Sequence, residues 1–284
     1  MDPLSAEEIR QCVRVALAED IGAGDVTALA LVPENATAVA VMRAREPLIV
    51  AGLALAETAF RELSADLSLV RRIEDGRRAE RGEAMLEING LARPILSGER
   101  VALNFVQRLS GVATLTRQFV DAVAGTHAKI LDTRKTTPGW RLLEKYAVAC
   151  GGGQNHRLGL FDMVLIKDNH LAALKAESQN VIAEALQRAR AKYPQLKVEI
   201  EADTLEQVEQ ALAAGADLIL LDNMSPAQLR VAVARCKGVA QTEASGGVTL
   251  AGVKAIAETG VDFISIGALT HSARAVDIGL DFEM

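Results

Sequence analysis

The second half of the chain alternates short apolar runs with amphipathic stretches, and this alternation restricts the possible folds most. Runs typical of β-strands are expected at 128–131, 163–166, 198–200, 218–221, 239–242 and 263–266. Stretches with helical spacing separate several of them, at 182–192, 205–214, 227–236 and 250–258. Repeated βα units predict a parallel sheet, either closed as a barrel or open and doubly wound. Because the segment has room for about six or seven units and not eight, we favour a shortened, six- or seven-stranded α/β barrel.

The residues before 110 lack this alternation and predict a separate α/β domain with a small sheet. Ser5 and Glu8 have the spacing of a capping box at the start of a helix. The Ser110–Gly111 pair predicts a break in a later, long helix. Strands are expected at 37–42, 48–50, 67–73 and 84–88, and helices at 53–63 and from 95 to about 124.

We therefore expect two domains. The first is an N-terminal α/β domain over residues 1–110, and the second is the barrel over residues 111–274. The tail at 275–284 is free to pack back on the first domain.

Nearly every expected barrel strand ends in charged or glycine-rich sequence. These ends hold Asp132 to Lys135, Lys167 and Asp168, Glu199 and Glu201, Asp222 and Asn223, Glu243, and Gly267. The carboxyl ends of parallel strands meet at one rim, where α/β folds build their active sites. One or two such charges could simply cap the following helices, but gathering many ionisable groups at one rim is costly without a function. The pattern predicts a site at that rim.

The cationic side chains gather in one part of an otherwise acidic chain. The net charge is −6, yet residues 132–170 contain six Lys or Arg side chains against four carboxylates. A glycine run at 151–153 lies beside the cations that we expect at the rim, which are Arg134, Lys135, His156, Arg157 and Lys167. Arginine matches the shape of carboxylates and phosphates, and lysine acts as a point charge, so we predict a pocket for an anion with several charged groups. His156 is open to two roles, general acid or hydrogen-bond donor to that anion.

Two glycine sites near the end of the chain predict phosphate binding. Ser245–Gly247 lies before the helix expected at Leu250, and Gly267–Ala268 follows the final strand. Backbone N–H groups at a helix N-terminus bind anions, and glycine lets the ligand approach closely. The alternative is that both sites are tight turns without a ligand.

Carboxylates are also expected inside the pocket. Glu199 and Glu201 are two residues apart on a strand and therefore face the same way, and Asp222 ends the next strand. Such groups could hold sugar hydroxyls or a hydrated Mg²⁺ that touches phosphates, or they could form salt bridges at the barrel mouth. Glu201 is the stronger candidate of the two glutamates because it stands nearer the rim.

Composition argues against several other functions. The acidic net charge and 3% aromatic residues do not favour nucleic acid or an anionic membrane as a partner. The three widely spaced cysteines indicate neither a disulfide framework nor a zinc site and favour a reducing cytoplasm. His127 and His271 are expected to be structural or exposed. The polar, acidic N-terminal residues do not resemble a secretory signal, and no apolar run approaches the length of a membrane helix.

Several long motifs run through the chain. In order they are EDIGAGDVT at 19–27, GERVALNFVQRLSG at 98–111, DTRKTTPG at 132–139, GGGQNHRLGLFDMVLIKDNH at 151–170, LILLDNM at 218–224, EASGGV at 243–248 and SIGALTHS at 265–272. These motifs resemble those of the quinolinate phosphoribosyltransferases, the carboxylating nicotinate-nucleotide pyrophosphorylases of NAD biosynthesis. The resemblance covers nearly the whole chain. It implies an N-terminal open-faced α/β sandwich, a shortened barrel, and a homodimer whose subunits complete each other's active sites, with higher oligomers left open.

The resemblance also implies roles for individual side chains. Arg100 would be donated from the partner subunit. The groups that bind the carboxylates of quinolinate and the pyrophosphate would be Thr133, Arg134, Lys135, His156, Arg157 and Lys167. Glu201 and Asp222 would lie near the ribose and Mg²⁺, held directly or through water. The phosphate loops would be formed by Ser245, Gly246, Gly247, Ile266, Gly267 and Ala268. Catalytic roles would fall to Lys135, Glu201 and Asp222.

The implied reaction transfers phosphoribosyl from phosphoribosyl pyrophosphate to quinolinate, with loss of CO₂, and gives nicotinate mononucleotide and pyrophosphate. It needs no covalent nucleophile, so catalysis would rest on positioning and electrostatics. One alternative is a related transferase that accepts nicotinate, or the unknown acceptor of a molybdenum-associated paralogue; the number of cations favours quinolinate. A non-catalytic phosphosugar-binding barrel is the other alternative. Glu201 and Asp222 argue against it, because a pure anion binder would avoid carboxylates.

Overall fold

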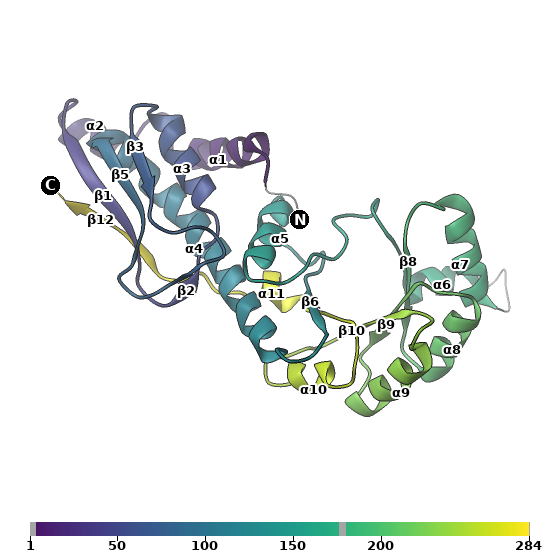
Figure 1. Ribbon diagram of the computed structural model, residues 1–284. Coiled ribbons are helices and arrows are strands. Elements are labelled where there is room, and N and C mark those ends of the chain that lie inside the picture. The colour runs from purple at the N-terminus through teal and green to yellow at the C-terminus, as the bar shows by residue number, and fades with distance from the viewer. Residues whose placement is uncertain (1–3, 176–179, 284) are drawn as a thin grey trace. The chain divides into compact units, whose positions relative to one another are not determined.

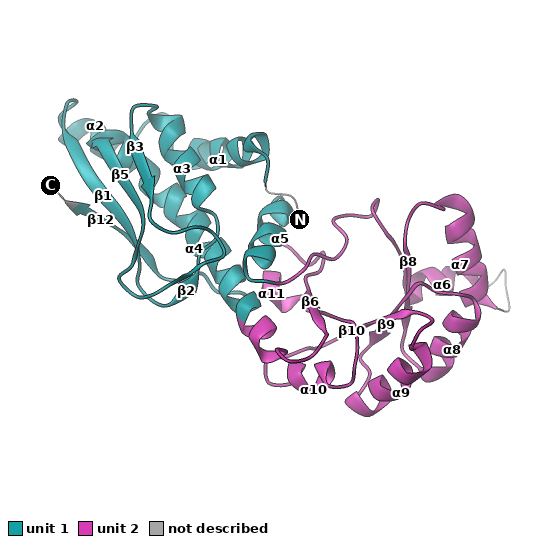
Figure 2. Cartoon of the chain, viewed as in Figure 1, with its two compact units in different colours: residues 1–117, 137–152, 272–284 teal, residues 118–136, 153–271 magenta. Residues whose placement is uncertain are grey.

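The computed structural model describes residues 4–175 and 180–283 (Figure 1). The chain forms two compact units (Figure 2). Unit 1 consists of residues 1–117, 137–152 and 272–284, and unit 2 of residues 118–136 and 153–271. The expected division at residues 110 and 111 stays a prediction, because compact packing and independent folding are different properties.

The sheet of unit 1 is antiparallel and includes the C-terminal strand. Its order is β12–β1–β5–β3, counted over the described residues, and its strands are β1 (Thr37–Ala44), β3 (Ser68–Arg71), β5 (Ala84–Leu91) and β12 (Ile278–Glu283). A short pair adds β2 (Leu48–Ile49) and β4 (Arg78–Ala79). Because β12 pairs with β1 from Val39 to Ala44, the C-terminal segment belongs to the sheet of the N-terminal part of the chain.

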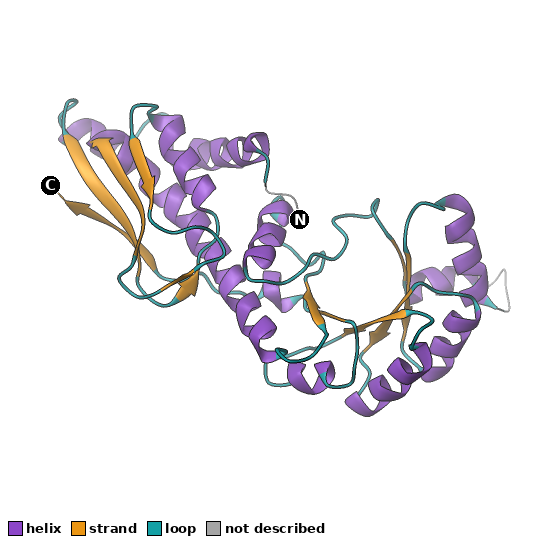
Figure 3. Cartoon of the chain, viewed as in Figure 1, coloured by secondary structure: helices purple, strands orange, loops and turns teal. Residues whose placement is uncertain are grey.

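The helices of unit 1 supply much of its core. They are α1 (Ala6–Ile21), α2 (Val26–Leu31), α3 (Leu53–Leu63), α4 (Ala92–Ala122, whose last residues belong to unit 2) and α5 (Arg141–Cys150). Figure 3 shows α3 and α4 along one face of the sheet. The predicted capping box is confirmed, since Ser5 Oγ accepts the Glu8 N–H and the Glu8 carboxylate accepts the Ser5 N–H.

The predicted break at Ser110–Gly111 is wrong, because α4 is continuous. A Cβ on Gly111 would lie 1.9 Å from the Arg274 carbonyl oxygen, so glycine is needed where the C-terminal segment crosses the helix. The Ser110 hydroxyl accepts the Ala51 N–H at 3.0 Å and is fully buried. Both residues therefore allow close packing within unit 1, and neither ends a helix.

Unit 2 is built on a parallel sheet with helices outside it (Figure 3). The order over the described residues is β6–β11–β10–β9–β8–β7, with strands β6 (Lys129–Leu131), β7 (Val164–Ile166), β8 (Val198–Ala202), β9 (Leu218–Asp222), β10 (Gln241–Ser245) and β11 (Phe263–Ser265). The helices are α6 (Asp168–Leu174), α7 (Val181–Lys192), α8 (Leu205–Ala213), α9 (Pro226–Cys236), α10 (Val253–Ala257) and α11 (Ala268–His271). The predicted fold class, a shortened α/β barrel with a separate N-terminal α/β domain, is confirmed.

One strand of the barrel differs from its expected position. The strand expected at 239–242 is β10, which begins and ends later, at Gln241 and Ser245. Val239 is 64% exposed and lies outside the strand. The expected strand began too early because this residue is apolar. The polar residues Thr242 and Glu243 are instead buried inside the sheet. No helix of the described residues is both long enough and apolar enough to cross a membrane.

Candidate active site

A cavity of about 750 Å³ lies at the carboxyl ends of the strands of unit 2. The predicted site residues that line it are Thr133, Arg134, Lys135, His156, Arg157, Lys167, Glu201, Asp222, Ser245, Gly246, Gly247, Ile266, Gly267 and Ala268. Arg100 does not belong to it: this residue is exposed on α4 of unit 1. Seven further residues line the cavity. Asn223 and Glu243 were expected at the rim without a role, whereas the sequence did not point to Leu165, Leu220, Val248, Ser265 and His271.

Parallel pairing explains why residues far apart in sequence meet in this cavity. Asp222 is the register partner of Ser245, so the end of β9 lies beside the glycine loop that follows β10. Glu201 and Glu243 are both register partners of Leu220 and flank it on either side. Residues at one register level of a parallel sheet reach the same rim.

Two guanidinium groups lie close together on the cationic side of the cavity. Burial and the neighbouring Arg134 lower the pKa of Arg157. Arg157 Nη1 donates to the Met163 carbonyl at 3.3 Å. Half-buried cations that repel one another are costly unless an anion joins them, so this pair indicates an anion site.

Lys135 is held through its backbone, which leaves its side chain at the cavity. Its N–H donates to Thr133 Oγ1 at 3.1 Å, and its carbonyl accepts the Thr270 hydroxyl at 2.7 Å. A Cβ on Gly267 would lie 3.0 Å from Lys135 Cδ and 3.1 Å from His271 Nε2. The glycine therefore makes room for a cation at the last strand. His271 borders the cavity, which the sequence did not predict for it.

Carboxylates also line the cavity. Lys167 Nζ forms an ion pair with Glu201 Oε2 at 2.8 Å, so one salt bridge of the kind considered from sequence is present. Glu201, Asp203 and Asp222 bring carboxylate oxygens within 4.8 Å of one another. Asp203 was missed because it follows the strand β8, beyond the alternation that singled out its neighbour.

The loop after β10 has the backbone expected of an anion cradle, although no helix begins where it was expected. Gly246 and Gly247 have φ values of +99° and +58°, and a Cβ on Gly246 would lie 2.2 Å from Asn223 Oδ1. The expected helix start at Leu250 is wrong: α10 begins at Val253. Residues 248–252, five in all, separate the glycines from a short helix, so its dipole contributes little to binding at the loop.

The glycine run at 151–153 has a packing role and is absent from the residues that line the cavity. A Cβ on Gly151 would lie 2.5 Å from the Ala113 carbonyl oxygen and 2.5 Å from Thr116 Cβ. Gly151 therefore allows the end of α5 to approach α4 within unit 1. Sequence alone does not distinguish this close approach from an anion-binding turn.

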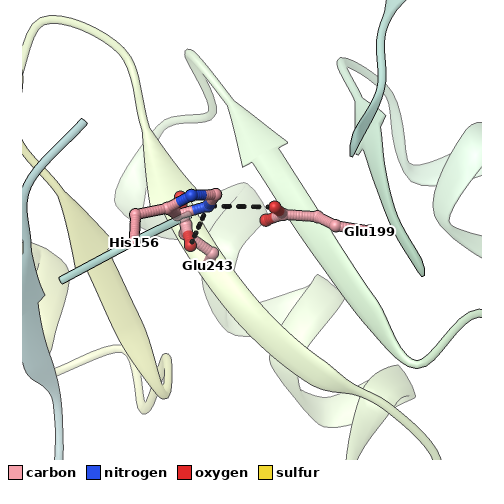
Figure 4. Close-up of side chains that lie close together, drawn as sticks. All are labelled: His156, Glu199 and Glu243. Atoms are coloured by element: carbon pink, nitrogen blue, oxygen red, sulfur yellow. Dashed lines mark hydrogen bonds and ion pairs between the residues drawn. The ribbon is translucent and has the colours of Figure 1, made fainter. Parts of the chain in front are cut away.

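The floor of the cavity holds His156 between two buried glutamates (Figure 4). Its Nε2 lies 3.0 Å from Glu199 Oε2 and 3.4 Å from Glu243 Oε2. Its backbone N–H donates at 2.9 Å to Asp132, which is fully buried and also accepts the Asn155 side-chain amide at 2.6 Å. The imidazole Nε2 thus faces carboxylates, whereas sequence analysis assigned it to an anionic ligand.

Two features of the surroundings of His156 favour opposite protonation states of its ring. Its Nδ1 accepts the Arg157 N–H at 2.8 Å, which favours the neutral ring. Burial lowers the pKa of His156, but Glu199 and Glu243 outweigh that effect and raise it to about 10. Losing one hydrogen bond costs about 1 kcal/mol, whereas leaving buried carboxylates without a cation costs several. We therefore assign the imidazolium. Burial also raises the pKa of Glu199, to about 7, against the effect of His156.

Comparison with known proteins gives a consistent result for both parts of the chain. Residues 25–110 match the family model of the quinolinate phosphoribosyl transferase N-terminal domain, and residues 112–281 match that of the C-terminal domain. The chain is 46% identical over 278 residues to the carboxylating nicotinate-nucleotide pyrophosphorylase of Mycobacterium leprae, with 96% of each chain covered. A probable enzyme of the same name from Bacillus subtilis is 44% identical, with 94% of this chain and 90% of the relative covered.

A solved structure supports the same relationship. The nicotinate-nucleotide pyrophosphorylase from Francisella tularensis superposes with a TM-score of 0.93 at 39% identity, over 99% of this chain and 98% of the other. Sequence motifs, fold and cavity all agree with this similarity. The chain belongs to the quinolinate phosphoribosyl transferase family.

Proposed function

We propose that this enzyme transfers the phosphoribosyl group of phosphoribosyl pyrophosphate to quinolinate and releases CO₂. The products are nicotinate mononucleotide and pyrophosphate, in the de novo synthesis of NAD. Family membership supports the proposal. The observation that carries it is the cavity itself, whose lining combines Arg134, Lys135, Arg157 and Lys167 with the carboxylates of Glu201 and Asp222.

The cations match the acceptor and the leaving group. Quinolinate has two adjacent carboxylates, and Arg134 and Arg157 provide planar donors for such groups. Lys135 and Lys167 provide point charges for pyrophosphate, whose negative charge grows as the bond to the ribose breaks. An acceptor with a single carboxylate would leave part of this positive charge without a partner.

The carboxylates match the developing positive charge on the sugar. The lone pair of the pyridine nitrogen forms the new bond to C1 of the ribose, and the electrons of the C1–O bond leave with pyrophosphate. Glu201 and Asp222 stabilise the cationic character of the ribose in this step. The bond from C2 of the ring to its carboxylate then breaks, CO₂ leaves, and the pyridinium nitrogen stabilises the electron pair until C2 takes a proton.

We infer that Mg²⁺ accompanies the pyrophosphate group. Glu201, Asp203 and Asp222 offer the oxygen donors that this ion prefers, with oxygens within 4.8 Å of one another. When bound, Mg²⁺ neutralises charge on the leaving group. Titration of Mn²⁺ by electron paramagnetic resonance, with phosphoribosyl pyrophosphate present, should show weaker binding in Asp222→Asn. Unchanged binding in that variant and in Glu201→Gln would contradict this inference.

We infer a homodimer in which Arg100 of one subunit completes the cavity of the other, as the family resemblance implies. Arg100 is exposed on α4, which leaves it accessible to a second chain. Arg100→Ala and Lys135→Ala should each be inactive alone and regain part of the activity when mixed, because hybrid dimers contain one intact site. No recovery, although the subunits exchange, would exclude a donated Arg100.

We also propose a cytoplasmic enzyme with small-molecule substrates and without nucleic acid or membrane partners. Cys12, Cys150 and Cys236 are all free thiols, which fits a reducing compartment. Fractionation of cells that produce the protein, with the activity measured in each fraction, tests this location. Activity that remains with the membrane fraction would contradict it.

The central experiment measures the two products with two acceptors. Purified protein with Mg²⁺, phosphoribosyl pyrophosphate and quinolinate should release CO₂ and pyrophosphate in equal amounts. The same protein with nicotinate should release neither at a comparable rate. Turnover of nicotinate but not quinolinate would overturn the proposed acceptor, and binding of both substrates without turnover would favour a non-catalytic barrel.

A further inference from the structure

The proposed reaction assigns no role to two buried carboxylates, Glu243, which lines the cavity, and Glu199, which contacts the cavity residue His156. Their side chains are 0% and 1% exposed. They come from β8 and β10, on either side of β9, and both approach the Nε2 atom of His156 (Figure 4). One N–H group cannot satisfy two carboxylates at once.

Most of the oxygens of this pair are unsatisfied. Among the residues that the structure describes, Glu199 Oε1 and both oxygens of Glu243 are buried without a hydrogen-bond partner. Buried carboxylates normally accept several hydrogen bonds, and leaving them without partners costs stability. An arrangement that opposes folding at the floor of the cavity requires a functional reason.

The surrounding contacts show what the pair can hold. His156 contacts the glutamates through Nε2, its Nδ1 lies 2.8 Å from the backbone nitrogen of Arg157, and its own backbone N–H donates to Asp132. Because Arg157 follows His156 directly in the chain, the contacts that fix His156 also fix the start of the Arg157 backbone. Arg157 also interacts favourably with Glu199 and unfavourably with Arg134. Negative charge at the floor thus offsets the repulsion between the two guanidinium groups.

We propose that Glu199 and Glu243 are positioning residues, which orient His156 and through it Arg157 for binding of the acceptor. They touch the ring of His156 and act on the ligand through that ring. Their charge keeps the cationic part of the cavity assembled before an anion arrives. This inference rests on the proposed function, because the ligand of Arg157 is taken to be the pyridine dicarboxylate.

Glu243→Gln tests the role with little change in side-chain shape. It should raise KM for quinolinate by about 10- to 100-fold, because small displacements of a binding group have effects of this size. The KM for phosphoribosyl pyrophosphate should stay unchanged, and kcat should fall less than KM rises. Glu184→Gln on the surface helix α7 provides a matched control, and it should leave both constants as in the wild type. An equal rise in KM for quinolinate and for phosphoribosyl pyrophosphate in Glu243→Gln would overturn the proposal.

A double-mutant cycle tests whether the glutamate acts through His156. In the His156→Ala background, Glu243→Gln should change the KM for quinolinate by less than about twofold, since the ring that it orients is gone. The full effect in that background would overturn the positioning role. Glu199→Gln serves as the second variant if Glu243→Gln does not fold, and thermal unfolding establishes which variants are folded.

Direct binding separates this inference from the proposed function. Equilibrium dialysis with quinolinate alone should show weaker binding to Glu243→Gln than to the wild type. Wild-type protein that neither binds nor converts quinolinate would overturn the proposed function, whereas equal binding by both proteins would overturn only the positioning role.

The same three side chains could instead hold a metal ion, because their ligand atoms lie within 4.8 Å of one another. Dialysis against Zn²⁺ or Mn²⁺ without substrates distinguishes the two. Stoichiometric metal in the wild type and in Asp222→Asn, but not in Glu243→Gln, would replace the positioning role with a metal site. No retained metal supports the positioning role.

Discussion

Glu144 of unit 1 and Glu243 of unit 2 are both fully buried, yet their surroundings are opposite. Glu144 Oε1 accepts from Arg108 Nη2 at 2.8 Å and from the Thr137 hydroxyl at 2.9 Å, and its Oε2 accepts the Thr137 N–H at 3.0 Å. Neither oxygen of Glu243 has a hydrogen-bond partner among the described residues. The exposed fraction is 0% for both residues, so burial alone does not separate them.

The difference lies in what each carboxylate contributes. A satisfied buried carboxylate fixes the chain segments that bond to it, which is an architectural role. An unsatisfied one reduces stability and persists where a ligand site needs its charge. Glu144 ties α5 to α4 and to the chain at Thr137, whereas Glu243 borders the cavity beside His156. The number of hydrogen bonds therefore distinguishes architecture from function here.

The largest expected effect is the loss of stability when Glu144, the carboxylate with several hydrogen-bond partners, is replaced. Glu144→Ala should lower the free energy of unfolding by about 3–5 kcal/mol, because it removes the buried carboxylate that Arg108 Nη2 contacts and two hydrogen bonds to Thr137. Urea unfolding followed by circular dichroism measures the change. Glu144→Gln, which keeps part of the hydrogen bonding, should lose less. A loss below about 1 kcal/mol in Glu144→Ala would remove the contrast on which the comparison depends.

The next effect is on activity, from the cations of the cavity. Lys135→Ala should lower kcat/KM by about 100- to 1000-fold, the size seen when one group that stabilises transition-state charge is removed. Its stability should stay near that of the wild type because the Lys135 side chain is exposed. Lys129→Ala is the matched control, since Lys129 is exposed and begins the strand β6 at the end away from the cavity. Equal activity losses in both variants would show that the cavity is not the active site.

The sequence predicted those parts of the fold that depend on local pattern. Strand and helix periodicities are local, so the alternation of β8, α8, β9 and α9 was recognisable along the chain. The charged residues at strand ends were equally recognisable, because parallel strands bring their carboxyl ends together. Fourteen of the fifteen predicted site residues line one cavity for this reason. Their functional roles remain predictions.

The parts that sequence missed depend on contacts between distant segments. The strand β10, with sequence QTEAS, has no apolar run, so its buried Glu243 was not placed at the cavity floor. Gly111 was predicted to break a helix and Gly151 was grouped with the cations of the expected site, although each allows a backbone to approach a helix closely. In the sequence, a glycine that forms a turn cannot be told from one that permits a close contact. Only the structure shows which neighbouring atoms a larger side chain would meet.

A smaller effect, of opposite sign to that of Glu144→Ala, is expected at the cavity floor. Glu243→Gln should leave the free energy of unfolding unchanged or raise it by about 1 kcal/mol, because it removes one of two carboxylates that compete for His156. Urea unfolding under identical conditions compares it with Glu144→Gln. A large loss of stability in Glu243→Gln would mean that both carboxylates are architectural.

The smallest effects are expected from pH, in opposite directions for the two units. The folded-state pKa of His156 is raised to about 10 from 6.5, so its contribution is fully present below pH 6.5 and is lost as pH rises through about 10. Hydrogen bonds from Arg274 and the Asp277 N–H lower the pKa of Glu46 to about 2 from 4.5, so that contribution is present above pH 4.5 and is lost as pH falls through about 2. Glu46→Gln should cost about 1 kcal/mol or less at pH 7, since the pair is partly exposed.

Urea unfolding at several pH values separates these two contributions. The difference in stability between wild type and Glu46→Gln should shrink from pH 5 to pH 2, as the Glu46 carboxylate takes up a proton in the folded state. Between pH 7 and pH 10 the wild type should lose stability more steeply than His156→Asn, because the folded state keeps on His156 a proton that the unfolded state has released. Equal slopes in this alkaline range would mean that His156 is neutral in the folded protein. Its Nδ1 would then keep the hydrogen bond from Arg157 N–H, and the two glutamates would have no cation between them.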